Sequence, residues 1–207
     1  TTIEVFVDGQ LVDRSVKELD AAVSNASKGE YKHYMLKEIY EQPEAIQQTI
    51  SQALNSNALR EDFLAQAEQD FANIQQVQII ACGTSYHAGM IAKYWFEQLI
   101  DVPCQVEIAS EFRYRTPVIV NNTLYLCISQ SGETADTLSV MREAKKRGSK
   151  VLAITNVVGS SIDREADKVI YCDAGPEISV ASTKAYTAQL MALYLLGLDF
   201  GYKVGTY

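Results

Sequence analysis

Residues 124–134 read LYLCISQSGET, an apolar run that leads into a hydroxyl-rich turn. The segment that follows, residues 135–147, has apolar residues at helical spacing, namely Ala135, Leu138, Met141 and Ala144. Gly148 supplies the expected C-terminal stop, so the order is strand, turn, helix. The first turn of a helix has unpaired backbone N–H groups and the positive end of the helix dipole, which favours an anion by about 0.3–2 kcal/mol.

Four polar side chains surround this turn: Ser129, Gln130, Ser131 and Thr134. Three carry hydroxyl groups and one carries an amide, and a phosphate monoester is the ligand that such groups suit best. Serine and threonine are also the usual N-cap residues of helices, so simple capping of the helix is the alternative explanation.

Five short apolar runs alternate with helical segments in the second half of the chain. The runs are residues 77–81, 105–108, 123–128, 150–155 and 168–171. The helical segments are residues 85–100, 110–114, 133–147, 160–166 and 182–198. This alternation predicts the α/β class, a three-layer αβα sandwich around a five-stranded parallel sheet.

A five-stranded sheet of this kind commonly has the flavodoxin-like order 2-1-3-4-5, which places the topological switch point between strands 1 and 3. Strand 1 is followed by Cys82, Gly83, Thr84 and Ser85, and strand 3 by the turn at residues 129–134. We therefore expect the two loops to face each other across the crevice where such sheets bind ligands. A third small polar turn, residues 179–183, enters the last helix and is placed to close the pocket.

The first 75 residues predict a different organisation. Residues 1–12 alternate as in strands around Asp8-Gly9, which predicts a hairpin. Two short strands are not stable alone, so we expect the hairpin to belong to a larger unit. Helices are expected over residues 33–40, from Pro43 to residue 54, and over residues 62–71. We divide the chain into residues 1–29, a remnant and linker, residues 30–75, a helical lead-in, and residues 76–207, the α/β domain.

Residues 199–202, DFGY, depart from the amphipathic pattern, and this predicts that the last helix stops near residue 198.

Composition limits the classes of function. Hydrophobic residues make up 47% and charged residues 21%, as is typical of globular proteins, and the net charge of -8 argues against a nucleic-acid-binding surface. No run of about 18 apolar residues and no signal-peptide pattern is present, so we expect a cytoplasmic protein that does not bind membranes. The four cysteines are expected to be buried, reduced thiols. We expect no metal site and no cofactor, since only two histidines occur and no tight ligand cluster is visible.

Four motifs together carry a resemblance to a known family. They are CGTSYHAG at residues 82–89, EIASEFRY at 107–114, SQSGETADT at 129–137 and VASTKA at 180–185. In this order they resemble the first sugar-isomerase (SIS) domain of the glutamine–fructose-6-phosphate aminotransferases, also called glucosamine-6-phosphate synthases. The similarity runs from about residue 31 to the last helix, and the leading hairpin resembles the end of the glutaminase domain in that family.

The resemblance implies part of a two-part enzyme. A glutaminase domain releases ammonia from glutamine, and two SIS domains in tandem add it to fructose 6-phosphate and isomerise the product to glucosamine 6-phosphate. Ser129, Gln130, Ser131 and Thr134 would hold the phosphate. The sugar would be lined by Cys82, Gly83, Thr84 and Ser85 and contacted from the third turn by Val180 and Ser182.

The resemblance also implies that catalytic groups of the family lie outside this chain. The glutaminase cysteine belongs upstream, and the general-base glutamate, the ring-opening histidine and the C-terminal lysine belong to the second SIS domain and the tail. We therefore expect a fragment that binds sugar phosphate weakly and holds no catalytic residue. The expected partners are the remainder of the enzyme and a second copy in a homodimer.

The roles of Cys82 and Lys184 have more than one interpretation, and two other classes of protein are alternatives to this family. Cys82 precedes a helix and suits a pocket wall better than a nucleophile, because no base is evident beside it. Lys184 opposes the dipole of the last helix, which suggests a role on an anion or a neighbouring subunit. A non-catalytic sugar-phosphate sensor is an alternative, although no basic recognition helix is present. A flavin-binding flavodoxin is another, although its phosphate loop normally follows strand 1.

Overall fold

Five parallel strands form the centre of the computed structural model, which describes residues 4–13, 27–55, 58–60, 63, 73–118 and 120–204. They are β5 (Gln76–Ala81), β6 (Cys104–Ile108), β7 (Thr123–Ser129), β8 (Lys150–Thr155) and β9 (Lys168–Tyr171). Their order is β6-β5-β7-β8-β9, and every neighbouring pair is parallel. This confirms the predicted order 2-1-3-4-5.

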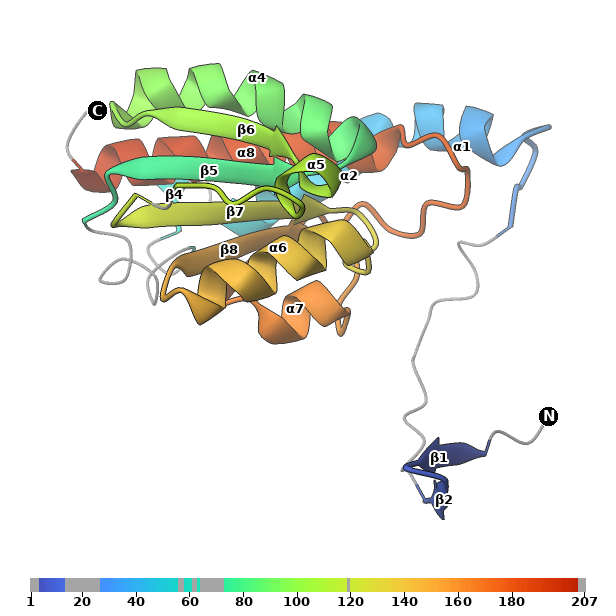
Figure 1. Cartoon of the computed structure of the whole chain (residues 1–207). Coiled ribbons are helices and arrows are strands. Elements are labelled where there is room, and N and C mark those ends of the chain that lie inside the picture. Colours follow the sequence, from blue (N-terminus) through green and yellow to red (C-terminus); the bar gives the residue numbers. More distant parts are fainter. Residues whose placement is uncertain are drawn as a thin grey trace.

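Helices cover both faces of the sheet and produce three layers (Figure 1). One face carries α2 (Gln42–Ala53), α4 (Gly83–Ile100) and α8 (Lys184–Val204). The other carries α5 (Ala109–Phe112), α6 (Ala135–Lys146) and α7 (Ser161–Glu165). The predicted αβα sandwich is therefore confirmed.

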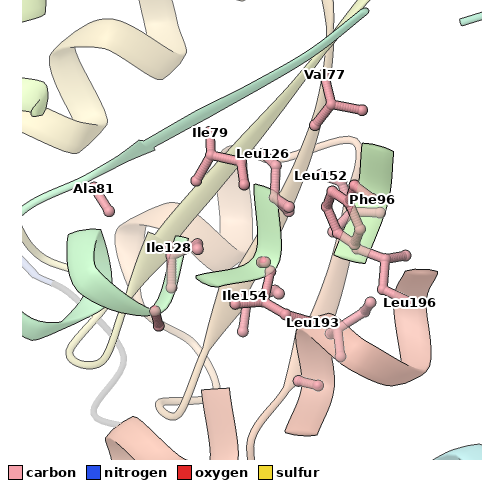
Figure 2. Close-up of a cluster of buried hydrophobic side chains, with 14 of the residues drawn as sticks. Val77, Ile79, Ala81, Phe96, Leu126, Ile128, Leu152, Ile154, Leu193 and Leu196 are labelled. Carbon is pink, nitrogen blue, oxygen red and sulfur yellow. The ribbon is translucent and has the colours of Figure 1, made fainter. Parts of the chain in front are cut away.

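The alternation of side chains along the strands creates two separate cores. In β7, Leu126 and Ile128 point toward α4 and α8, where Phe96 and Leu193 are fully buried (Figure 2). The intervening Cys127 faces α6 and packs in the second cluster. Because β7 is buried along its whole length on both faces, its sequence is a continuous apolar run.

Two helices lead into the sheet, α1 (Tyr34–Tyr40) and α2, which has Pro43 in its first turn as predicted. The hydroxyl of Thr49 in α2 donates a hydrogen bond of 2.5 Å to the carbonyl of Cys172, just after β9. The lead-in is therefore fixed at the carboxyl end of the sheet. A short hairpin, β3 (Leu54–Asn55) with β4 (Ala58–Leu59), follows it and was not predicted.

The N-terminal hairpin is formed by β1 (Val5–Val7) and β2 (Gln10–Val12). Asp8 and Gly9 both have positive φ, 51° and 79°, as the predicted tight turn requires. Phe6 and Leu11 are 59% and 63% exposed. That the hairpin belongs to a larger unit stays a prediction, as does the division of the chain into three parts. The helix expected over residues 62–71 lies outside the described residues except for Phe63.

The last helix corrects one prediction. Instead of stopping near residue 198, α8 continues to Val204. Asp199 is 2% exposed and forms an ion pair of 3.1 Å with Lys203, one turn further on, while Phe200 packs into the core. The helix is packed between α2 and α4, so the amphipathic pattern of a surface helix does not apply to it. No helix among the residues described here is long and apolar enough to cross a membrane.

Candidate functional site

The loops after β5 and β7 begin side by side at the carboxyl edge of the sheet. Ala81 and Ile128 are paired neighbours, so Cys82 and Ser129 follow at the same edge. From there the chain diverges, because α4 covers one face and α6 the other. Such a divergence is the topological switch point of an open α/β sheet, where ligands bind. The predicted juxtaposition of the two loops is confirmed.

The turn between β7 and α6 is held by its own hydroxyl groups. Ser129, which is 2% exposed, accepts a hydrogen bond of 3.1 Å from the Gly132 amide, and its Oγ lies 2.8 Å from the Thr134 hydroxyl. Ser131 accepts a hydrogen bond of 3.2 Å from the Glu133 amide. The Ser131 side chain is exposed, and those of Gln130 and Thr134 are partly exposed. Buried Ser129 therefore stabilises the turn from inside the fold. The side chains of Gln130, Ser131 and Thr134 are accessible to a ligand.

Gly132 is required in this turn for two reasons. Its φ is +66°, in the left-handed region, and a Cβ atom there would lie 2.1 Å from the Oγ of Ser160. The carbonyl of Gly132 also accepts a hydrogen bond of 3.0 Å from the Ile162 amide. The start of α7 therefore lies directly against the turn and fixes its position.

Neither α4 nor α6 is capped by the side chain of its N-cap residue. Thr134 is the N-cap residue of α6 and Cys82 that of α4, and neither makes a side-chain cap hydrogen bond. Simple capping by the N-cap residue, the alternative explanation of the hydroxyl-rich turn, is therefore not what this structure shows. The N-terminal amides of both helices keep their capacity for an anion.

The β5–α4 loop, which we take as Cys82 together with residues 83–85 in the first turn of α4, supplies small and polar groups next to this turn. Gly83 has φ +57° with open space where a Cβ would lie, and Thr84 is exposed. Ser85 is only 6% exposed, so its hydroxyl is less accessible than that of Thr84. Cys82 is half-buried, and no hydrogen bond links its thiol to a base among the residues that the structure describes. The loop therefore offers a wall with one exposed hydroxyl and no activated nucleophile.

Two glutamates that the sequence analysis missed hold the third turn. Glu38 of α1, 2% exposed, accepts hydrogen bonds from the amides of Ile178 (2.6 Å) and Ser179 (3.1 Å) and from the Ser179 hydroxyl. Glu177 accepts hydrogen bonds from the Thr183 amide (2.7 Å) and the Ser182 hydroxyl (2.9 Å). A carboxylate at this end of α8 complements the helix dipole.

The third turn presents Val180 fully to solvent, whereas the Ser182 hydroxyl is engaged by Glu177. Lys184 is 5% exposed, and its ammonium group lies 2.8 Å from Glu41. Burial raises the pKa of the Glu41 carboxyl, but the hydrogen bond and charge of Lys184 and the nearby Lys37 outweigh it and lower the pKa overall. The suggested role of Lys184 on an anion or another subunit is replaced by an ion pair within this chain.

Glu133, at the end of the β7–α6 turn, has a structural role. Its carboxylate accepts a hydrogen bond of 2.7 Å from the Ser161 amide at the start of α7. The hydrogen bonds from Ser161 lower the pKa of Glu133, so it stays ionised at neutral pH. A carboxylate of this kind joins the turn to α7 and is poorly suited to proton transfer at neutral pH.

The remaining thiols are chemically inert. Burial raises the pKa of each to about 12: Cys104, Cys127 and Cys172. All four cysteines are free, as predicted, although Cys82 is only half-buried. Within the described part of the chain, no group of three or more His, Cys, Asp or Glu residues is placed to hold a metal ion.

A hollow of about 570 Å³ lies between α6 and the residues that follow α5, and its lining includes Ala135, directly after the β7–α6 turn. Its arginines are neutralised by carboxylates of the same chain. Arg113 pairs with Asp136, and Arg147 with Glu143, both at 2.6 Å. Because these guanidinium groups are already paired, they are less available to an anion than unpaired cations would be.

Comparison with known proteins gives one family. A family model described as "SIS domain" matches residues 70–198. The "Glutamine--fructose-6-phosphate aminotransferase [isomerizing]" of Acinetobacter baylyi is 71% identical over an alignment 206 residues long, which covers 97% of this chain and 34% of that protein. The protein of the same name from Caldanaerobacter subterraneus is 51% identical, over 99% of this chain and 33% of that protein. The chain thus spans about a third of the curated relatives it matches.

A solved structure agrees with these matches. The "C-terminal domain of glucosamine-fructose-6-phosphate aminotransferase from Francisella tularensis" superimposes with a TM-score of 0.84 at 50% identity. The alignment covers 87% of this chain and 51% of that one.

Proposed function

The chain belongs to the SIS domain family, and on that premise we propose that it is the sugar-phosphate-binding part of the isomerase region of a glutamine–fructose-6-phosphate aminotransferase. In such an enzyme the substrates are glutamine and fructose 6-phosphate, and the products are glutamate and glucosamine 6-phosphate. The ligand we assign to this chain is the hexose 6-phosphate. The observation that supports it best is the braced β7–α6 turn at the switch point, with accessible hydroxyls beside two uncapped helix starts.

The chemistry of the turn suits a phosphate monoester. The group carries between about 1.5 and 2 negative charges at pH 7 and has three acceptor oxygens. Ser131, Gln130 and Thr134 each offer a donor, and the first turn of α6 adds backbone amides. These are neutral donors, so binding does not require the basic surface that this acidic chain lacks. A hydrogen bond to a charged group contributes about 1.5–3 kcal/mol, so a few of them give measurable but weak binding.

The sugar would extend from the phosphate toward the β5–α4 loop and the third turn. Thr84 is the exposed hydroxyl on the first side, and Val180 is the exposed apolar side chain on the second. Cys82 and Gly83 are small and leave room for the ring, while Ser85 and Ser182 lie in the walls behind. In this arrangement the chain binds and orients the sugar.

Proton transfer to or from the sugar needs a group that this site does not supply. Glu133, the carboxylate of the turn, is bound to the Ser161 amide, and the Cys82 thiol has no base beside it in the described residues. We therefore propose that catalysis depends on the rest of the enzyme, a glutaminase domain and a second SIS domain, in a cytoplasmic homodimer. Production of glucosamine 6-phosphate by the isolated chain from fructose 6-phosphate and glutamine would contradict this division of labour.

The test of the binding site is a pair of hydroxyl deletions. Glucosamine 6-phosphate is titrated into the ¹⁵N-labelled chain, and its affinity is compared between the wild type and the double variant Ser131→Ala/Thr134→Ala. We expect at least a tenfold loss, because two hydrogen bonds to a charged group are removed. Ser139→Ala, in the second turn of α6, is the matched control and should bind like the wild type. Unchanged affinity in the double variant would place the phosphate elsewhere.

A crystal of the chain with bound glucosamine 6-phosphate gives an independent check. The phosphorus atom is expected at the β7–α6 turn, within hydrogen-bond reach of the Ser131 hydroxyl. A phosphorus position in the hollow beside α6 would instead assign the site to that surface.

A further inference from the structure

Asn156, the first residue after β8, lies between two of the loops assigned to the ligand. Its backbone amide donates a hydrogen bond of 3.1 Å to the carbonyl of Gln130 in the β7–α6 turn. Its side chain reaches in the other direction, where Nδ2 donates to the carbonyl of Gly175 and Oδ1 accepts from the amide of Ala174, both at 2.8 Å. Asn156 therefore binds the β7–α6 turn, below called the phosphate turn, through its backbone. It binds the β9–α8 connection through its side chain.

The connection that Asn156 holds continues directly into the third turn. Gly175 is followed by Pro176, whose φ is fixed by its ring, and then by Glu177. Glu177 in turn binds the Thr183 amide and the Ser182 hydroxyl. A short chain of hydrogen bonds and stiff backbone thus runs from Gln130 through Asn156 to the start of α8.

We propose that Asn156 is a positioning residue, which sets the spacing between the phosphate turn and the third turn so that both meet the same sugar phosphate. The inference rests on the proposed function, and it adds a role for a residue that does not itself touch the ligand. A ligand that bridges two loops binds more tightly when their spacing is fixed beforehand, because the cost of ordering them is not met at binding. Inorganic phosphate occupies only the phosphate turn and gains nothing from that spacing.

This difference between two probes defines the experiment. Asn156→Ala removes both side-chain hydrogen bonds but keeps the backbone amide that binds Gln130. The affinities of the chain for inorganic phosphate and for glucosamine 6-phosphate are measured by ¹⁵N chemical-shift titration. We expect the affinity for glucosamine 6-phosphate to fall by about five- to tenfold and that for inorganic phosphate to change less than about twofold.

Hydrogen exchange measures the link without any ligand. The amide of Ala174 is bound by Asn156 Oδ1, so it should exchange faster in Asn156→Ala. The matched control is Asn121→Ala, an asparagine at the amino edge of the sheet, which should alter neither ligand affinity nor Ala174 exchange. The midpoint of urea unfolding checks that each variant is folded. If Asn156→Ala does not fold, the milder variant Asn156→Ser replaces it in the same binding and exchange measurements.

The outcomes separate the two proposals. Equal losses for both probes would show that Asn156 only stabilises the phosphate turn, and unchanged affinity for the hexose phosphate would show no role in binding. Either result overturns the positioning role and leaves the proposed function intact. A wild-type chain that binds neither probe would refute the proposed function, and the positioning role with it.

Discussion

Gly132→Ala tests whether the phosphate turn is as tightly packed as its geometry requires. The left-handed φ of +66° costs alanine about 1–2 kcal/mol. The new Cβ would lie 2.1 Å from Ser160 Oγ and 2.5 Å from Ser160 Cβ, so α7 must shift, and overpacking of this kind costs about 1–3 kcal/mol. We therefore expect the free energy of unfolding to fall by about 2–5 kcal/mol, measured by urea denaturation.

The matched control is Gly83→Ala at the start of α4. Gly83 has a similar φ of +57°, but nothing lies within 4 Å of the position of its Cβ. In Gly83→Ala the free energy of unfolding should fall only by the cost of the left-handed φ, about 1–2 kcal/mol. The difference between the two variants therefore isolates the collision with Ser160.

A double variant makes the reasoning refutable in a second way. Ser160→Gly removes the two atoms nearest the new Cβ, so Gly132→Ala should cost much less in that background than in the wild type. If Gly132→Ala costs no more than Gly83→Ala, or if Ser160→Gly gives no rescue, then α7 does not hold the turn in the way described. Affinity for glucosamine 6-phosphate should fall in Gly132→Ala and recover in part in the double variant.

Three further predictions follow from the charges and thiols. Because the pKa of Glu41 is lowered in the folded chain, its pairing stabilises the fold above the ordinary pKa of 4.5 and loses this effect as the pH falls through the folded pKa. The gap in unfolding free energy between wild type and Glu41→Gln should therefore be full near pH 7 and close at acid pH, and a constant gap in urea titrations would contradict this. In the native chain at pH 8 a thiol reagent should modify Cys82 alone, and Cys82→Ala would abolish this reaction. Denaturation should make the other three cysteines reactive, because burial no longer raises their pKa. Glucosamine 6-phosphate should slow the reaction of Cys82 with the reagent. Equally fast labelling at saturating ligand would show that Cys82 does not line the sugar.

The sheet was predictable from sequence because its three central strands, β5, β7 and β8, are buried on both faces. Such strands are continuous runs of Val, Ile and Leu, and each is separated from the next by a segment of helical period. The predicted bounds of β7 and β8 match within one residue. The place of the candidate site was predicted from topology alone, since the order of the strands, which the structure confirms, fixes which loops meet at the switch point.

The residues that hold the site were not predictable in the same way. Glu38 lies 140 residues before Ile178, and no local pattern connects a glutamate in one helix to the amides of a distant turn. Lys184 looked unfavourable at a helix start because its partner Glu41 is equally remote in sequence. The last helix extends beyond its predicted end because Asp199 and Lys203, one turn apart, form an ion pair within it. The helix also packs on two sides, so its sequence lacks the amphipathic pattern that marks the end of a surface helix. A test for charge pairs four residues apart would have found that signal.

The distribution of hydrogen bonds explains why this site needs so much support from remote residues. A phosphate bound by the neutral donors of this turn would gain much of its free energy from geometry, because the nearby Arg113 and Arg142 are already paired with carboxylates. Loops are the most mobile parts of a fold, and donors that must first be ordered bind weakly. Here the amides of Gly132 and Glu133 are bound by serine hydroxyls, the Gly132 carbonyl by α7, and the Gln130 carbonyl by Asn156. These bonds are present without ligand, so the cost of ordering the turn is met during folding, and this is how a few neutral donors would suffice for the phosphate that we propose binds there.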